Sequence, residues 1–120
     1  MKILGFDHVQ VAMPEHEEAA ARRFYGELLG LEEIAKPVEI AGRGGVWFAC
    51  GRQQLHLGVE VSFRPAKKAH PALLVDGYDE LMQRLRAEGF EVVEDRAVPS
   101  LTRFFTSDPF GNRIEVLRSE

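Results

Sequence analysis

An internal repeat constrains the fold of this chain more than any other feature of its sequence. The first copy begins at FDHVQV, passes through a helix-like stretch to GLEE and ends at QQLHLG. The second copy begins at AHPALLV, passes through a helix-like stretch to GFEV and ends at NRIEVL. His8 aligns with His70, and His56 falls near Glu115, with separations of 48 residues (56 − 8) and 45 residues (115 − 70). The repeat therefore predicts two similar halves, each with a candidate metal ligand at both of its ends.

The first half is expected to fold as βαβββ. Alternation of side chains predicts a strand over residues 3–12, in which Gln10 shares a face with His8. Pro14 and the acidic residues after it indicate the start of a helix, for which Gly30 is the expected end. The apolar stripe of this helix consists of Ala20, Phe24 and Leu28.

Three further strands are expected in this half, a short one over residues 32–35 and longer ones over 46–50 and 53–59. A two-residue turn at Gly51-Arg52 between the longer strands places Trp47 opposite His56. Directly opposed residues of an antiparallel pair point to the same face of a sheet. Trp47 is therefore a candidate wall of a substrate site, although plain core packing explains it equally well.

The second half repeats the order. Strands are expected over residues 70–75, 90–94, 102–106 and 112–117, with a helix that begins near Tyr78 and that Gly89 ends. The segment DPFG at residues 108–111 has strong turn chemistry. If this segment is a four-residue loop, Phe104 lies opposite Glu115, as Trp47 lies opposite His56. Phe104 is accordingly a second candidate for the wall of the site, with core packing as the alternative.

Together these patterns predict an α+β fold. Two βαβββ modules would form a curved, eight-stranded mixed sheet with the helices outside. The whole chain, residues 1–120, is expected to be one domain made of half-modules 1–62 and 63–120, because its length supports a single hydrophobic core. The basic, proline-interrupted segment over residues 63–69 is interpreted as a solvated linker between the halves, rather than as a site that attracts an anionic substrate.

Composition excludes several classes of protein. A net charge of −4 and an isoelectric point near 5.6 argue against nucleic-acid binding. The apolar runs are far shorter than the roughly 20 residues that a membrane helix needs. The first residues lead directly into a strand pattern instead of a secretory signal, and the one cysteine, Cys50, has no partner for an intramolecular disulfide. We therefore expect a cytoplasmic protein.

The three strand histidines and Glu115 are the candidate metal ligands. A single histidine on a strand is more often a hydrogen-bonded structural residue, as His16 in its acidic, exposed surroundings illustrates. Glu115 strengthens the metal hypothesis, because it interrupts the apolar run around Ile114 and Val116 on a strand that should face a sheet interior. A buried carboxylate needs a cation or hydrogen-bond donors. A salt bridge to Arg113 or Arg103 is the simpler explanation.

The chain resembles the vicinal oxygen chelate superfamily, which includes glyoxalase I, extradiol dioxygenases and bleomycin-resistance proteins. The resemblance covers essentially the whole chain and is most specific in FDHVQVAM, AHPALLVDGYDEL and DPFGNRIEVL. It implies that His8, His70 and Glu115 form a two-histidine, one-carboxylate set for one divalent metal per site, which could be iron, manganese, nickel, cobalt or zinc. His56 matches a fourth position that holds a ligand in some family members. If it is not a ligand, it is a candidate general base.

The resemblance implies a homodimer whose sites lie between subunits, because the family often builds each metal site from half-modules of two chains. His8 and His56 would then come from one chain, and His70 and Glu115 from the other. The activity implied is metal-dependent lyase, isomerase, transferase or dioxygenase chemistry on a small molecule, with Gln10, Trp47 and Phe104 as candidate substrate contacts. His56 departs from the glutamate that glyoxalase I generally carries there. The alternative is a metal-free binding protein of the bleomycin-resistance type.

Overall fold

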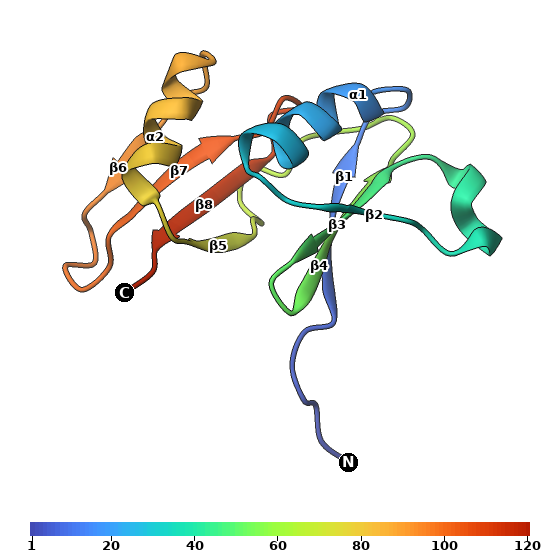
Figure 1. Cartoon of the computed structure of the whole chain (residues 1–120), viewed down its shortest axis with the longest axis horizontal. Helices are drawn as coiled ribbons and strands as arrows, with labels where there is room; N and C mark the ends of the chain where they lie inside the picture. Colours follow the sequence, from blue (N-terminus) through green and yellow to red (C-terminus); the bar gives the residue numbers. More distant parts are fainter. The chain divides into compact units, whose positions relative to one another are not determined.

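The computed structural model describes all 120 residues, and the chain divides into two compact units, Met1–Arg64 and Pro65–Glu120. Each unit has a four-stranded sheet and a helical segment that follows the first strand (Figure 1). The predicted fold of two βαβββ modules is confirmed, and the eight strands are hydrogen-bonded as two sheets of four. No helix is long and apolar enough to cross a membrane.

The first unit contains four strands and a helical segment of mixed type. Its elements are β1 (His8–Met13), α1 (Glu18–Ala21), the π-helix η1 (Arg22–Leu28), β2 (Glu33–Ile34), the 3-10 helix η2 (Val38–Arg43), β3 (Val46–Cys50) and β4 (Gln53–Val59). The two-residue turn between β3 and β4 is confirmed, as is the pairing of Trp47 with His56.

The second unit repeats the order with a longer regular helix. Its elements are β5 (Ala72–Val75), α2 (Tyr78–Ala87), β6 (Val93–Asp95), β7 (Arg103–Ser107) and β8 (Arg113–Arg118). The predicted helix beginning at Tyr78 is confirmed, and it ends just before Gly89, whose φ of 86° is readily adopted only by glycine.

The repeat extends to the register of the strands. The sheets have the orders β1-β4-β3-β2 and β5-β8-β7-β6, and in each the first and last strands of the unit pair in parallel. Gln10 lies opposite His56 in the first sheet, and Ala72 lies opposite Glu115 in the second. His8 and His70 stand two residues before these matched positions. The two halves are therefore related residue by residue around the candidate ligands.

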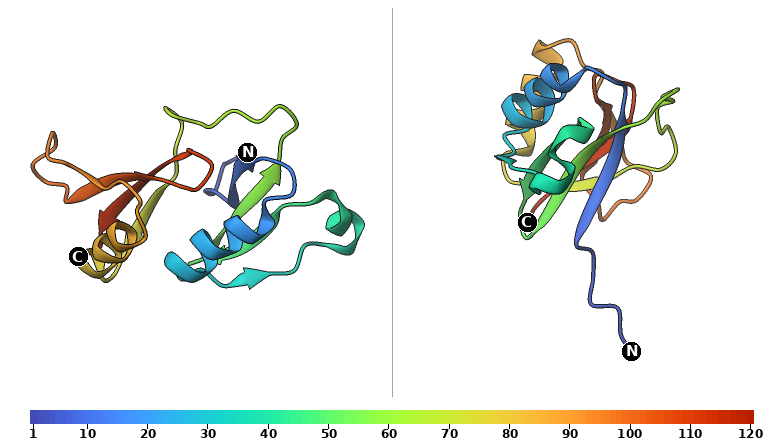
Figure 2. Two further views of the ribbon diagram at one scale, coloured as in Figure 1. Left: turned by 90° about the horizontal axis from the view of Figure 1, so that it is seen from above. Right: turned by 90° about the vertical axis from the view of Figure 1, so that its right-hand side faces the viewer.

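One face of each sheet is buried under its helix, as the views in Figure 2 show for α1 and α2. In the first unit the π-helix buries Phe24 and Tyr25, and Tyr25 contacts Phe48 of β3 with ring centroids 5.9 Å apart. In the second unit Tyr78 of α2 contacts Phe104 of β7 at 5.2 Å. Since side chains alternate along a strand, the candidate ligands are left on the opposite, open faces.

Two boundaries in the first half differ from the sequence-based expectation. The first strand begins at His8 instead of residue 3, because β1 pairs only with β4 and His8 already lies opposite Gln54, one residue from the start of β4. The helix begins at Glu18 instead of directly after Pro14. His16 has a φ of 66°, which is left-handed and incompatible with a right-handed helix at that point.

The pairing predicted for Phe104 is wrong by one residue. Asn112 belongs to the loop between β7 and β8, because its backbone and side-chain nitrogens both donate hydrogen bonds to the carboxylate of Asp108 at 2.9 Å. The loop therefore has five residues, and Phe105 instead of Phe104 lies opposite Glu115. Phe104 points into the core, where it is fully buried. Phe105 takes the place that the repeat assigns to Trp47.

We predict that Gly45→Ala destabilises the first unit. Gly45 has a φ of 84°, and a Cβ there would overlap the carbonyl oxygen of Leu57. The strain should lower the free energy of unfolding by about 1–3 kcal/mol. Gly42→Ala is the matched control, since Gly42 has an ordinary φ and open space around its Cβ position. Urea denaturation measures both variants, and equal stabilities would contradict the prediction.

Candidate metal centre

The open face of the first unit carries a stack of three aromatic rings. The His56 ring lies parallel to the indole of Trp47, with centroids 3.6 Å apart and an interplanar angle of 4°. The ring of His8, from the neighbouring strand β1, stacks on His56 at 4.2 Å. Gln10 lies on the same face, with its side-chain amide over Gly58. The structure thus brings together His8, His56 and two of the predicted substrate contacts.

The hydrogen bonds of the two rings leave different nitrogens free. Nδ1 of His8 lies 2.9 Å from the carboxylate of Asp7, which can only accept a hydrogen bond, so Nε2 keeps the lone pair of the neutral ring. In His56 it is Nε2 that donates, to Oε1 of Gln54 at 2.8 Å, so the lone pair of that ring is on Nδ1. The free lone pair is therefore on Nε2 in His8 and on Nδ1 in His56, so the two rings present different atoms to a metal or a substrate.

Burial lowers the pKa of His56 below its usual value of 6.5, and the charge of His8 lowers it further, while Asp7 acts in the opposite direction. The folded chain therefore favours the neutral imidazole. Because the unfolded chain takes up the proton first as pH falls, the stabilisation from His56 is complete above about pH 6.5 and decreases through the folded-state pKa. A neutral imidazole with a free Nδ1 is the form that accepts a proton from a substrate.

We predict that Trp47→Leu raises the pKa of His56 back toward 6.5, because it uncovers the ring and readmits water. The measurement is an NMR titration of the histidine ring protons, with the His56 signal assigned from its absence in His56→Gln. A His56 that titrates at or above 6.5 in the unmodified protein would contradict the account of its environment.

The open face of the second unit holds the other candidate pair. Nε2 of His70 lies 2.9 Å from Oε1 of Glu115, and the Glu115 side chain is only 9% exposed. Nη1 of Arg103 lies 3.2 Å from Oε2 of the same carboxylate. Arg103 also pairs with Asp95 at 3.5 Å. The salt bridge considered as the simpler explanation for Glu115 therefore exists with Arg103 and not with Arg113, alongside the contact with His70.

The His70–Glu115 contact requires a cation. Nδ1 of His70 lies 2.8 Å from the carbonyl oxygen of Lys68, so this nitrogen must donate. In a neutral ring Nε2 then carries only a lone pair, and it faces a carboxylate oxygen that is also an acceptor. Either a proton or a metal ion must lie between them. A backbone carbonyl on the other ring nitrogen is the usual support of a metal-bound histidine.

The 2.9 Å between Nε2 of His70 and Oε1 of Glu115 suits a shared proton and also an octahedral metal ion. Two ligands that each bind such a metal at about 2.1 Å, at a right angle to one another, are separated by about 3.0 Å. The rings of His8 and His56 are stacked with their planes 19° apart, so their in-plane lone pairs do not point at one another. Neither unit by itself gathers three or more side chains of the metal-binding types. Convergence of all four residues stays a prediction.

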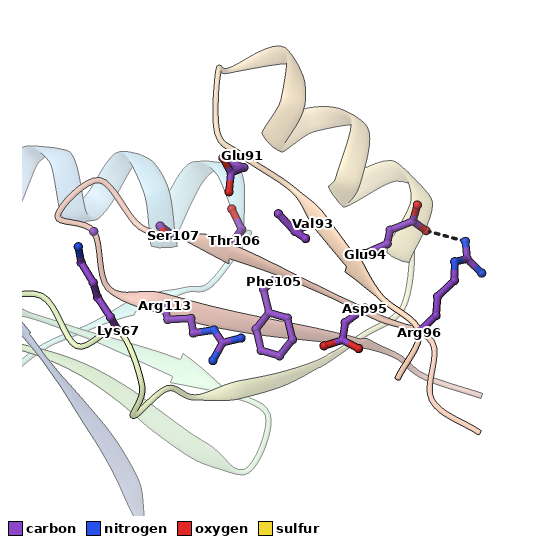
Figure 3. A pocket seen from close by; sticks show the side chains of 11 residues that line it. Lys67, Glu91, Val93, Glu94, Asp95, Arg96, Phe105, Thr106, Ser107 and Arg113 are labelled. Carbon is purple, nitrogen blue, oxygen red and sulfur yellow. Dashed lines mark hydrogen bonds and ion pairs between the residues drawn. The ribbon is translucent and has the colours of Figure 1, made fainter. Parts of the chain in front are cut away.

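Phe105 is the residue of this face that the sequence interpretation missed. Its ring contacts His70 edge to face at 5.5 Å and lies under the guanidinium of Arg113 at 3.9 Å. Phe105 also lines a cleft of about 610 Å³ (Figure 3), and its contact with His70 connects this cleft with the candidate ligand pair. Counting Asn112 as part of the loop would have assigned Phe105 to this face from the sequence.

Comparisons with known proteins define the family. Residues 5–116 match the Glyoxalase/Bleomycin resistance protein/Dioxygenase superfamily, and the chain belongs to it, as the resemblance predicted. A glyoxalase family protein from Bacillus anthracis is 54% identical and has a TM-score of 0.94, with 100% of this chain and 98% of that chain covered. No curated protein sequence matches the chain.

Two more distant solved structures show the same fold. A lactoylglutathione lyase from Agrobacterium tumefaciens is 24% identical, with a TM-score of 0.75 over 99% of this chain and 96% of its own. A fosfomycin resistance protein from Listeria monocytogenes is 17% identical, with a TM-score of 0.77 and the same two coverages. At these identities the likeness concerns the fold alone.

Proposed function

We propose that the protein is a metal-dependent enzyme of the glyoxalase/dioxygenase superfamily, with His8, His70 and Glu115 as the ligands of one divalent metal. The observation that carries the proposal is the contact between Nε2 of His70 and the carboxylate of Glu115, two acceptors that need a cation between them. His8 presents Nε2 in the same way, with its Nδ1 held by a carboxylate. The metal would be iron, manganese, nickel, cobalt or zinc.

In the proposed reaction the metal site, the general base and the apolar walls have separate roles. A divalent metal supplies electrophilic stabilisation of an oxyanion or enolate when bound. His56 acts as general base through Nδ1, because its lowered pKa keeps the ring neutral and Trp47 fixes its plane. Arg103 positions the Glu115 carboxylate from the side opposite His70. Trp47 and Phe105 provide the apolar walls that exclude water from the substrate.

We further propose a homodimer in which each site takes His8 and His56 from one chain and His70 and Glu115 from the other. Each pair is assembled within its own unit, so that two incomplete halves can complete one another. Large apolar side chains before β1 are left uncovered by the single chain, as expected for a surface that meets a second copy. These exposed side chains are Met1, Ile3, Leu4 and Phe6.

A metal-free binding protein is the second candidate function. The observation that favours it is the ion pair between Arg103 and Glu115, which neutralises the carboxylate without a metal. In that case a protonated His70 completes the pair, and the cleft beside Phe105 binds a small molecule without converting it. The two functions differ in whether the four residues bind a metal at all.

Metal analysis separates the two. The purified chain is stripped with a chelator, reloaded with each of the five metals in turn and assayed against a panel of small substrates with adjacent oxygens. The proposal expects one metal per chain and activity that is lost on chelation and restored on reloading. A fully folded protein that binds none of the five metals with micromolar or tighter affinity would contradict the metal-dependent enzyme. The metal-free binding protein would then be the supported function.

A further inference from the structure

One arginine on the open face of the second unit has no counter-charge. The guanidinium of Arg113 lies flat against Phe105, with its central carbon 3.9 Å from the ring centroid, and it makes no ion pair. Neighbouring arginines are already neutralised: Arg103 pairs with Asp95 and Glu115, and Arg96 pairs with Glu94. A half-buried cation that is stacked and unpaired is available to an anion from outside the chain.

Arg113 faces the cleft of about 610 Å³ that Phe105 lines, and the cleft has a second unpaired cation, Lys67 (Figure 3). The segment that carries Lys67 is tied to β8. The amide of Arg113 donates to the carbonyl oxygen of Ala66 at 2.9 Å, and the amide of Ala66 donates to Oδ1 of Asn112 at 3.0 Å. The residues expected to form a solvated linker therefore hold a lysine beside Arg113.

The one unpaired carboxylate of the cleft does not cancel these cations. Glu91 lies at the edge of the cleft beside Thr106, whereas Arg113 and Lys67 lie on the opposite side with the Phe105 ring (Figure 3). The other two acidic residues of the lining, Glu94 and Asp95, are occupied by arginines. The side of the cleft that faces Phe105 is therefore positive.

We propose that Arg113, assisted by Lys67, binds an oxyanion group of the substrate, either a carboxylate or a phosphoryl group. Stacking on Phe105 orients the plane of the guanidinium and leaves its N–H edge open for two parallel hydrogen bonds to such a group. This inference rests on the proposed function, because it assigns the substrate class of the same site. It makes Arg113 a residue that determines specificity.

The position of Arg113 also bounds the size of the substrate. Arg113 and Glu115 stand two residues apart on the same face of β8, so their Cα atoms are about 7 Å apart. The anionic group and the reacting oxygens therefore belong to one compact molecule, separated by a few bonds. A neutral substrate would leave the Arg113 cation without a partner in the occupied cleft.

The test titrates the full chain, freed of metal with a chelator, with inorganic phosphate and separately with acetate at constant ionic strength. The readout is the NMR signal of the Arg113 Nε–H group. We expect a saturable shift with at least one probe, and the better probe distinguishes a phosphoryl from a carboxylate preference. Arg113→Met should weaken binding about tenfold or more. Arg86→Met, which removes an equal charge from the exposed last turn of α2, outside the cleft lining, should leave it unchanged.

Arg113→Lys guards against a folding defect, since it keeps the positive charge and loses only the planar guanidinium. Its affinity for the anion should lie between that of the unmodified protein and that of Arg113→Met. Equal losses in Arg113→Met and Arg86→Met, or no saturable shift with either probe, would overturn the proposal. Metal affinity is measured on the same variants and should be unaffected by Arg113→Met. Failure of the anion site is therefore separable from failure of the metal site.

Discussion

Glu115→Gln is expected to abolish high-affinity metal binding. The substitution keeps the size of a side chain that is 9% exposed but removes the only anionic ligand in the proposed set. Loss of a residue that merely supports a ligand already costs about 10- to 100-fold in metal affinity, so loss of a ligand itself should cost at least about 100-fold. Isothermal titration with cobalt or zinc measures the effect, with urea denaturation alongside to confirm that the fold survives.

Two further variants make this result specific. Glu94→Gln removes an equal charge from the same unit, at a residue paired with Arg96, and should bind metal normally. His56→Gln should keep most of the metal affinity and lose the activity, because its Nε2 is held by Gln54 and its ring is stacked between Trp47 and His8. Equal losses of metal in His56→Gln and Glu115→Gln would show instead that His56 is a full ligand.

The repeat made the fold predictable from the sequence. Periodicity and turn chemistry placed seven of the eight strands to within three residues, and the first strand begins five residues later than expected. The short Gly51-Arg52 turn fixed the pairing of Trp47 with His56. The loop after β7 was harder, because hydrogen bonds from Asn112 to Asp108 lengthen it by one residue. With side chains alternating every residue, that single addition exchanges Phe104 for Phe105 on the open face.

The surroundings of the ligands were less predictable than the ligands themselves. The sequence indicated His8, His56, His70 and Glu115 through their places in the repeat. It gave no sign that Nδ1 of His70 is held by a backbone carbonyl, or that the three rings of the first unit form a stack. Such contacts depend on the geometry of neighbouring strands, which a pattern of residue types does not encode.

Mixing two inactive variants should restore one metal site in each mixed dimer. The His8→Ala chain keeps His70 and Glu115, and the Glu115→Gln chain keeps His8 and His56. If every site takes one pair from each chain, the mixed dimer has one intact site out of two, while both parent dimers have none. Mixing His70→Ala with Glu115→Gln is the matched control, because both losses fall in the same pair and no intact site can form.

Metal content of these mixtures, measured after mass spectrometry confirms subunit exchange, tests the shared metal site most directly. We expect one tightly bound metal per mixed dimer from His8→Ala and Glu115→Gln, and none from the control mixture. A monomeric protein, or no recovered metal in the confirmed mixed dimer, would contradict a site built from the His8–His56 pair of one chain and the His70–Glu115 pair of another.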